Sequence, residues 1–142
     1  MPYRWHDQGA TAGIVIAEAP YRQLAGLMEV DLKPVFGDKT NYRAMLKHQR
    51  PKPEDLLEAK DEALDALGEP YEAFFSDNDE VREMEYPVVE YPKSISSVRL
   101  EKVQEIEAKL LGIKGQYLLF DSGQALNLRN HIGYRVSLTL QP

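Results

Sequence analysis

The chain has 142 residues, of which 43% are hydrophobic, and its formal net charge is −6. This length can bury one core or two small ones, and no stretch approaches the roughly 20 apolar residues of a membrane span. The first residues show no basic region followed by an apolar run, so a secretory signal is not indicated. The absence of cysteine excludes a disulfide, a thiolate zinc site and a cysteine nucleophile within this chain. We therefore expect a soluble cytoplasmic protein with no membrane partner.

Charge is strongly segregated along the sequence. Residues 39–52 carry +5 with no acid, whereas residues 54–85 carry −11. The basic segment can be a solvated loop that faces the acidic helix after it, or a patch that contacts nucleic-acid phosphates. The second interpretation gives five candidate nucleic-acid-binding residues: Lys39, Arg43, Lys47, Arg50 and Lys52.

The first third predicts a strand followed by a helix. The β-branched run Ile14 to Ile16 fits a short buried strand. A helix is expected over residues 21–33, with Pro20 in its first turn and Pro34 at its end. A helical wheel places Glu29 away from the core and Asp31 inside the apolar arc, where local exposure or a basic-segment partner would explain it. The core-facing residues are expected to be Leu24, Leu27, Met28 and Leu32.

Two more helices are predicted in the middle of the chain. A short one over residues 41–47 would take Thr40 as its N-cap and present Tyr42, Met45 and Leu46 on its apolar side. The clearest helical pattern covers residues 54–67, with acids in the first turn and Gly68 at the end.

The last third changes to strand-like patterning. The sequence "EYPVVEYP" predicts an extended connector over residues 83–94, because each proline disfavours helix at the tyrosine before it. Period-two alternation then dominates, including residues 105–110 and residues 134–140, with turns at Lys114-Gly115 and at residues 121–123. We expect an α+β protein with an α/β region over residues 1–82 and a small antiparallel β-barrel or curled sheet over residues 95–142.

Such a barrel raises a second nucleic-acid hypothesis, in which exposed aromatic rings stack on bases beside a basic rim. Tyr134 is more readily a core residue, because it shares a face with Val136 and Leu138, and His131 is expected to be exposed in a turn. Three scattered histidines do not predict a metal site. The platform and rim candidates are Tyr117, Phe120, Tyr134, Lys109, Lys114, Arg129 and Arg135.

Several stretches together resemble one known family. These are "RWHDQGA", "RQLAGLMEVDLK", "DKTNYRAMLK", "EYPVVEYPKSIS" and "LLGIKGQYLLFDSGQALNLRNHIGYRV". In the same order they resemble the middle and C-terminal portions of an uncharacterised bacterial family, domain of unknown function 2797. The resemblance implies that longer members have a cysteine-rich, zinc-binding-like part and two strands ahead of the region that corresponds to Tyr3.

The first part of that region is in turn similar to the GIY-YIG nuclease domain. The resemblance implies that Arg4 contacts the scissile phosphate, that residues 13–17 form the third strand, and that Glu29 holds a catalytic Mg²⁺. Only three residues precede Arg4, so the strands that would supply a tyrosine base are expected to be missing. We therefore expect no catalysis by this chain alone and no resident cofactor, with Mg²⁺ bound only if other strands complete the site.

Three functions follow as hypotheses. The first is a non-catalytic, nuclease-like module that binds or accompanies nucleic acid. The second is a protein-interaction module, a homodimer or a partner's docking site, that uses an unpaired strand edge and the acidic helix. The third is a fragment of a Mg²⁺-dependent nuclease.

Overall fold

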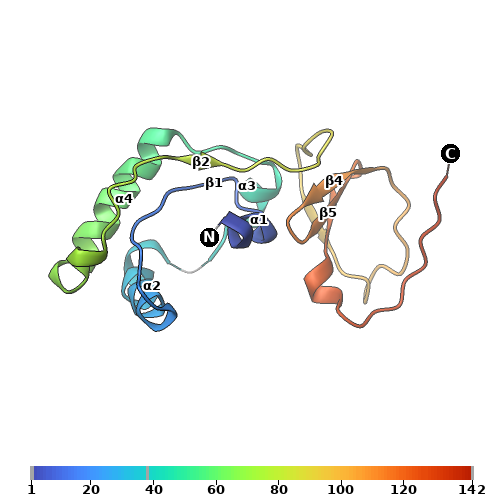
Figure 1. Ribbon diagram of the computed structural model, residues 1–142. Coiled ribbons are helices and arrows are strands. Elements are labelled where there is room, and N and C mark those ends of the chain that lie inside the picture. Colours follow the sequence, from blue (N-terminus) through green and yellow to red (C-terminus); the bar gives the residue numbers. More distant parts are fainter. Residues whose placement is uncertain (1, 38, 142) are drawn as a thin grey trace. The chain divides into compact units, whose positions relative to one another are not determined.

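The computed structural model describes residues 2–37 and 39–141, which form two compact units (Figure 1). The helical unit comprises residues 10–85, and the sheet unit joins residues 1–9 to residues 86–142. In chain order the elements are α1 (Pro2–Gln8), β1 (Ala12–Gly13), α2 (Arg22–Phe36), α3 (Tyr42–Leu46), α4 (Pro53–Leu67), η1 (Glu69–Phe74), β2 (Arg82–Glu83), β3 (Ser96–Val98), β4 (Leu110–Lys114), β5 (Tyr117–Phe120), β6 (Gln124–Asn127) and η2 (Leu128–His131).

The helical unit is organised around the contact between α2 and α4. Its buried apolar side chains come from three helices and from the segment after β2. The buried residues are Met28, Leu46, Ala63, Leu67 and Met84.

The strand prediction for Ile14 to Ile16 is wrong: these residues have no strand structure, and β1 ends just before them at Gly13. β1 pairs antiparallel with β2, and beyond it the Ser76 amide donates to the Ile16 carbonyl at 3.0 Å. Ala17 forms an antiparallel bridge with Phe75. The stretch is therefore held by backbone bonds to two later segments, but its side chains are only half-buried.

The helix predicted over residues 21–33 is confirmed as α2, with corrections to its ends, to its core-facing residues and to the partner of Asp31. Pro20 precedes the helix, and Pro34 lies inside its last turn instead of ending it; Gly37 is the C-cap. Leu27 is 50% exposed, whereas Met28 at the next position is buried. The hydroxyl of Tyr71 donates to the Asp31 carboxylate at 2.7 Å, so the partner of Asp31 comes from η1 and not from the basic segment.

The two following helices agree with prediction, except at one cap. In α3 the side chain of Asn41, not of Thr40, accepts the Ala44 amide at 3.2 Å. Leu46 is buried as expected, but Tyr42 is 53% exposed. In α4 the acids of the first turn and the Gly68 C-cap lie where the sequence places them.

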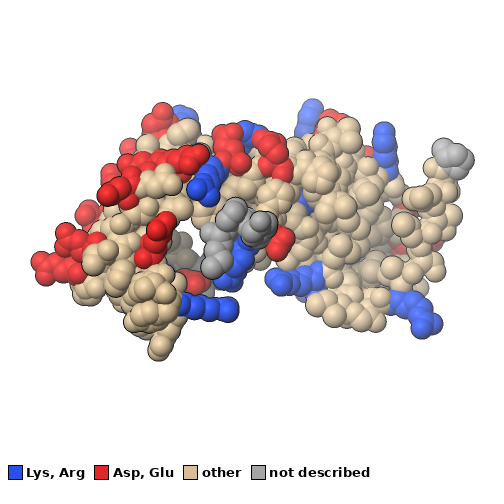
Figure 2. Space-filling view, in the orientation of Figure 1, with Lys and Arg blue, Asp and Glu red and all other residues tan. Residues whose placement is uncertain are grey.

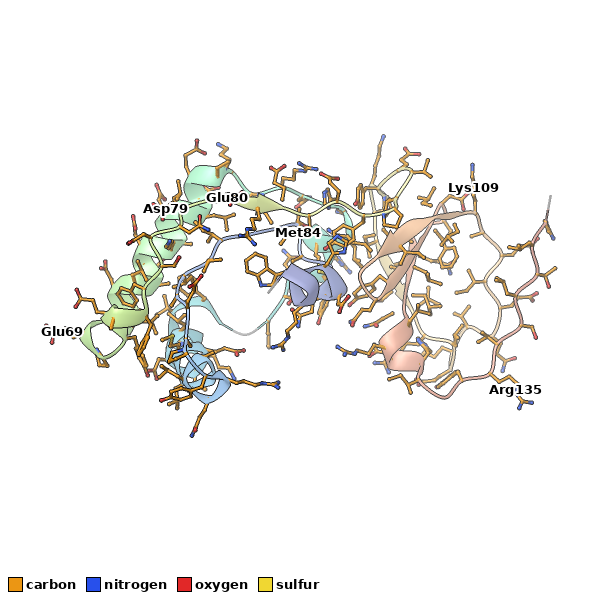
Figure 3. The ribbon with its side chains drawn as sticks, viewed as in Figure 1. Glu69, Asp79, Glu80, Met84, Lys109 and Arg135 are labelled. Atoms are coloured by element: carbon orange, nitrogen blue, oxygen red, sulfur yellow. The ribbon has the colours of Figure 1, made fainter. Side chains whose placement is uncertain are left out.

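One lysine of α4 is buried in the helical unit. Lys60 is only 3% exposed, and its Nζ donates to the Asp79 carboxylate at 2.8 Å and to the Asn78 carbonyl at 2.9 Å. Figure 3 labels Asp79 and Glu80 on the segment that passes along α4. The ammonium therefore ties this otherwise irregular segment to the helix.

Replacing Lys60 by methionine is expected to lower the free energy of unfolding. The apolar stem is kept, but two charge-assisted hydrogen bonds are lost, so we expect a loss of about 1–3 kcal/mol. Urea unfolding followed by circular dichroism measures it. The matched control is Lys52→Met at the exposed N-cap of α4, expected to change stability by less than about 0.5 kcal/mol. Equal effects of the two substitutions would contradict the assigned role of Lys60.

The sheet unit contains four strands in the order β3-β6-β5-β4. β4, β5 and β6 form an antiparallel meander, whereas β3 pairs parallel with β6. The α+β class agrees with prediction, but the sheet is open and mixed, so the closed antiparallel barrel is not confirmed. The two predicted turns are present, with Gly115 and Gly123 at positive φ between the antiparallel strands.

Two strands expected from alternation do not form. Residues 105–109 precede β4 without strand structure, and residues 134–140 have none either. After η2 the chain turns at Gly133, where φ is +87°, and leaves as an extended coil (Figure 1). Alternation alone could not show this, because a strand also needs a neighbour with which to pair.

A segment of the predicted connector lies against the outer side of β4. Val88 bridges Gly112, the Val89 amide donates to the Leu111 carbonyl at 2.8 Å, and the Ile113 amide donates to the Pro87 carbonyl at 3.2 Å. A side chain at residue 112 would collide with this segment, so glycine permits the contact.

Candidate functional site

The five residues of the basic segment lie on and around α3 in the helical unit. Lys39, Arg43 and Lys52 are exposed and Lys47 is half-buried. Only Arg50 has a carboxylate partner among the described residues: its guanidinium contacts Glu83 and Glu85. The capped turn of α3 fixes the backbone that carries Arg43.

The acidic surface of the helical unit is centred on α4, where Figure 2 shows carboxylates gathered along the helix. The carboxylates that contact Arg50 belong to β2 and the residues after it, not to α4. The contact side chains are 41% to 69% exposed, and exposed ion pairs add at most about 1 kcal/mol each. The pairs therefore reduce the free charge of the segment without removing it.

The residues implied by the nuclease resemblance belong to different units. Arg4 is exposed on α1 in the sheet unit, and Glu29 is exposed on α2 in the helical unit. Glu29 points away from the core, as the helical wheel predicted. Within the described part of the chain, no three histidine, aspartate or glutamate side chains lie close enough to hold a metal ion.

A buried ammonium among aromatic rings is the most unusual chemical feature of the sheet unit. Lys114, at the end of β4, is 0% exposed. Its Nζ lies 5.3 Å from the ring centroid of Tyr86 and 5.7 Å from that of Tyr91. The imidazole of His6 lies against the ring of Tyr86, with 4.5 Å between the two ring centroids. These distances suit attraction between the cation and the ring faces.

Burial in this part of the sheet unit shifts the pKa values of Lys114 and Tyr86. Burial lowers the pKa of Lys114 to about 8, because the charged form loses its hydration. Burial, followed by the neighbouring Tyr91, raises the pKa of Tyr86 to about 12. Desolvation disfavours the charged ammonium, whereas attraction to the ring faces favours it.

The hairpin turn predicted at Lys114-Gly115 is present, but Lys114 is buried, so the prediction that it belongs to a basic rim is wrong. The available signal was the Glu-Tyr-Pro repeat with its spacing of five, which was interpreted only as a connector. The two prolines keep the chain extended, and both repeated tyrosines face the same lysine.

The predicted stacking platform is also corrected. Tyr117 is 5% exposed, with its hydroxyl accepting from the Asn127 side chain at 3.3 Å, so its ring cannot stack on a base. Tyr134 is 45% exposed and is not a core residue.

His131 is buried, not exposed as predicted. Its Nε2 accepts the Leu100 amide at 3.0 Å, and its Nδ1 lies 2.7 Å from the Asn127 carbonyl. The second contact requires the proton on Nδ1.

One cavity of about 270 Å³ lies in the sheet unit, beside the turn between β5 and β6. Tyr91 lines it, so one ring borders both the cavity and the buried ammonium. The Asp121 carboxylate accepts the Lys109 amide at 3.1 Å, and the Ser122 hydroxyl lies 2.9 Å from the side-chain oxygen of Gln124. These polar groups are already engaged within the turn, which favours a structural role for them.

These features define an α+β protein of two small units, one with an exposed basic segment and one with a buried lysine. Among the described helices, none is long and apolar enough to cross a membrane. The chain belongs to the family described as protein of unknown function (DUF2797), whose model matches residues 1–136. No curated protein and no solved structure matched it. The family resemblance is therefore confirmed, whereas the resemblance to GIY-YIG nucleases is not supported.

Proposed function

We propose that the helical unit binds the phosphate backbone of nucleic acid through the basic segment, residues 39–52. The observation that carries the proposal is local charge. Five cations occur within this segment without an acid, and four of them have no carboxylate partner in the described part of the chain. On a chain of net charge −6, this segment is the place where a polyanion is attracted most strongly.

The expected mode is non-specific contact with phosphates. Arg50 is held by Glu83 and Glu85, which leaves four cations to displace counterions from the nucleic acid. Each displaced counterion contributes about 0.7–0.9 to the logarithmic salt dependence, so four predict a slope of roughly −3. The acidic side chains of α4 repel the same ligand, and salt screens that repulsion over about 10 Å. Affinity should therefore be modest and strongly dependent on salt.

Fluorescence anisotropy with short labelled single-stranded RNA and DNA tests this function. Between about 50 and 200 mM salt, a slope near −3 lowers the binding constant by roughly 60-fold. Binding should differ little between sequences, because phosphate contacts carry no base information. Absence of binding at the lower salt concentration, or binding insensitive to salt, would contradict the proposal.

The catalytic roles of Arg4 and Glu29 stay predictions from the nuclease resemblance. The two residues belong to different units, and the proposed phosphate binding rests on the basic segment alone. The proposed function therefore does not include cleavage.

A further inference from the structure

An exposed aromatic ring lies within the basic segment. Tyr42, the first residue of α3, is 53% exposed, and the exposed Lys39 and Arg43 flank it in sequence. The Asn41 side chain accepts the Ala44 amide at 3.2 Å, so this cap fixes the backbone that carries the ring. Unpaired bases stack on aromatic rings beside cations, whereas the bases inside a duplex are already stacked on their neighbours. The ring therefore offers a contact that a single strand can make and the interior of a duplex cannot.

The cations are bordered by acids at the start of α4. Pro53 begins this helix directly after Lys52, and its first turn carries Glu54 and Asp55, which are both exposed. The helix has 15 residues and is about 22 Å long. More exposed acids follow along it: Glu58, Asp61, Glu62 and Asp65. The basic surface is therefore limited on this side, and a ligand that extends past it meets carboxylates.

A basic surface of this kind suits one phosphate backbone better than two. In a duplex the two backbones face each other across grooves about 6 and 12 Å wide. Charges repel each other over about 10 Å at 0.1 M salt, so the second backbone of a rigid duplex comes within range of the α4 carboxylates. A flexible single strand can bend away from these acids while its phosphates stay on the cations.

We propose that the basic segment binds single-stranded nucleic acid and that the ring of Tyr42 stacks on one of its bases. The inference rests on the proposed function, because the cations must hold the backbone from which the base is presented. Stacking accepts any base, so it adds affinity for unpaired strands without sequence specificity. It displaces no counterion, so it leaves the salt dependence of binding unchanged.

Fluorescence anisotropy of the full chain at about 50 mM salt tests the stacking with three labelled DNA probes of equal length. These are a single strand of thymidines, the same backbone without bases, and a duplex. The wild type should bind the single strand at least about fivefold more tightly than either other probe. Tyr42→Ala should lose the preference over the abasic strand without a change in salt slope, whereas Tyr42→Phe keeps the ring and should retain it. A single strand of uridines should show the same loss in Tyr42→Ala.

The matched control is Tyr21→Ala. It removes a ring that is 58% exposed at the N-cap of α2, in the same unit but outside the basic segment. This variant should bind all probes as the wild type does. Circular dichroism checks that each variant is folded.

The outcomes separate this inference from the proposed function. If the wild type binds no probe, phosphate binding fails and the inference fails with it. If the wild type binds the abasic strand or the duplex as tightly as the single strand, phosphate binding stands and stacking by Tyr42 is refuted. Equal effects of Tyr42→Ala and Tyr21→Ala would refute it as well. A shallower salt slope in Tyr42→Ala would also contradict stacking, because it would show that the ring acts through the cations.

Discussion

Replacing Lys114 by methionine is expected to stabilise the protein at pH 7. The wild-type ammonium is fully buried, and its pKa is lowered from 10.5 to about 8. That shift corresponds to a cost of up to about 3 kcal/mol while the lysine is charged in the unfolded state. Methionine fills a similar volume without the charge, but it loses a ring attraction of roughly 0.5–2 kcal/mol. We expect a net gain of about 1–3 kcal/mol.

The pH dependence separates this explanation from a simple change in packing. Because the folded-state pKa of Lys114 is lowered, the cost is fully present below pH 8 and is relieved as pH rises towards 10.5. The advantage of Lys114→Met over wild type should therefore shrink between pH 8 and 9.5, as measured by urea unfolding. Lys109→Met, at an exposed position of the same unit, should show no such change. A variant less stable than wild type at pH 7, or a difference that is constant with pH, would contradict the account.

Gly112→Ala is expected to be strongly destabilising. An added Cβ would lie 2.4 Å from the Cα of Val88 and 2.5 Å from the carbonyl oxygen of Pro87. Both are backbone atoms, so the clash cannot be relieved by a side-chain rotation. The segment that covers β4 must move, and we expect a loss of about 3 kcal/mol or more in the free energy of unfolding.

Gly26→Ala is the matched control for this glycine. It lies on α2, where an added Cβ meets nothing within 4 Å, and alanine should stabilise the helix by up to about 1 kcal/mol. Thermal unfolding of both variants measures the difference. If Gly112→Ala unfolds at the wild-type temperature, the segment over β4 does not lie where the structure places it.

Helices α2, α3 and α4 could be predicted because their signals are local. Leucine spacing, acids in the first turn and a terminal glycine identify α4 within a few residues of sequence. The same local reasoning could not see that Lys60 is buried, because its partners at residues 78 and 79 are distant in sequence. The N-cap error at Thr40 is small, since Asn41 is the adjacent residue and supplies the same kind of oxygen.

The sheet and the candidate sites were harder to predict, because they depend on contacts between segments that are distant in sequence. The predicted turns correctly separated β4, β5 and β6, but alternation cannot distinguish a paired strand from the unpaired segment at residues 134–140. It also cannot give the parallel pairing of β3 with β6. The aromatic surroundings of Lys114 likewise require the 86–91 segment to lie beside β4, which no local pattern encodes.

The most direct test of the account concerns the basic segment. One variant replaces Lys39, Arg43, Lys47 and Lys52 by alanine, and its control replaces the same number of exposed cations in the sheet unit: Lys93, Lys102, Lys109 and Arg129. Both variants change the net charge equally, so a difference between them reports location and not total charge. Anisotropy at about 50 mM salt should show at least a tenfold loss of RNA and DNA binding for the basic-segment variant and little change for the control. Equal losses, or none in the first variant, would contradict phosphate binding by residues 39–52.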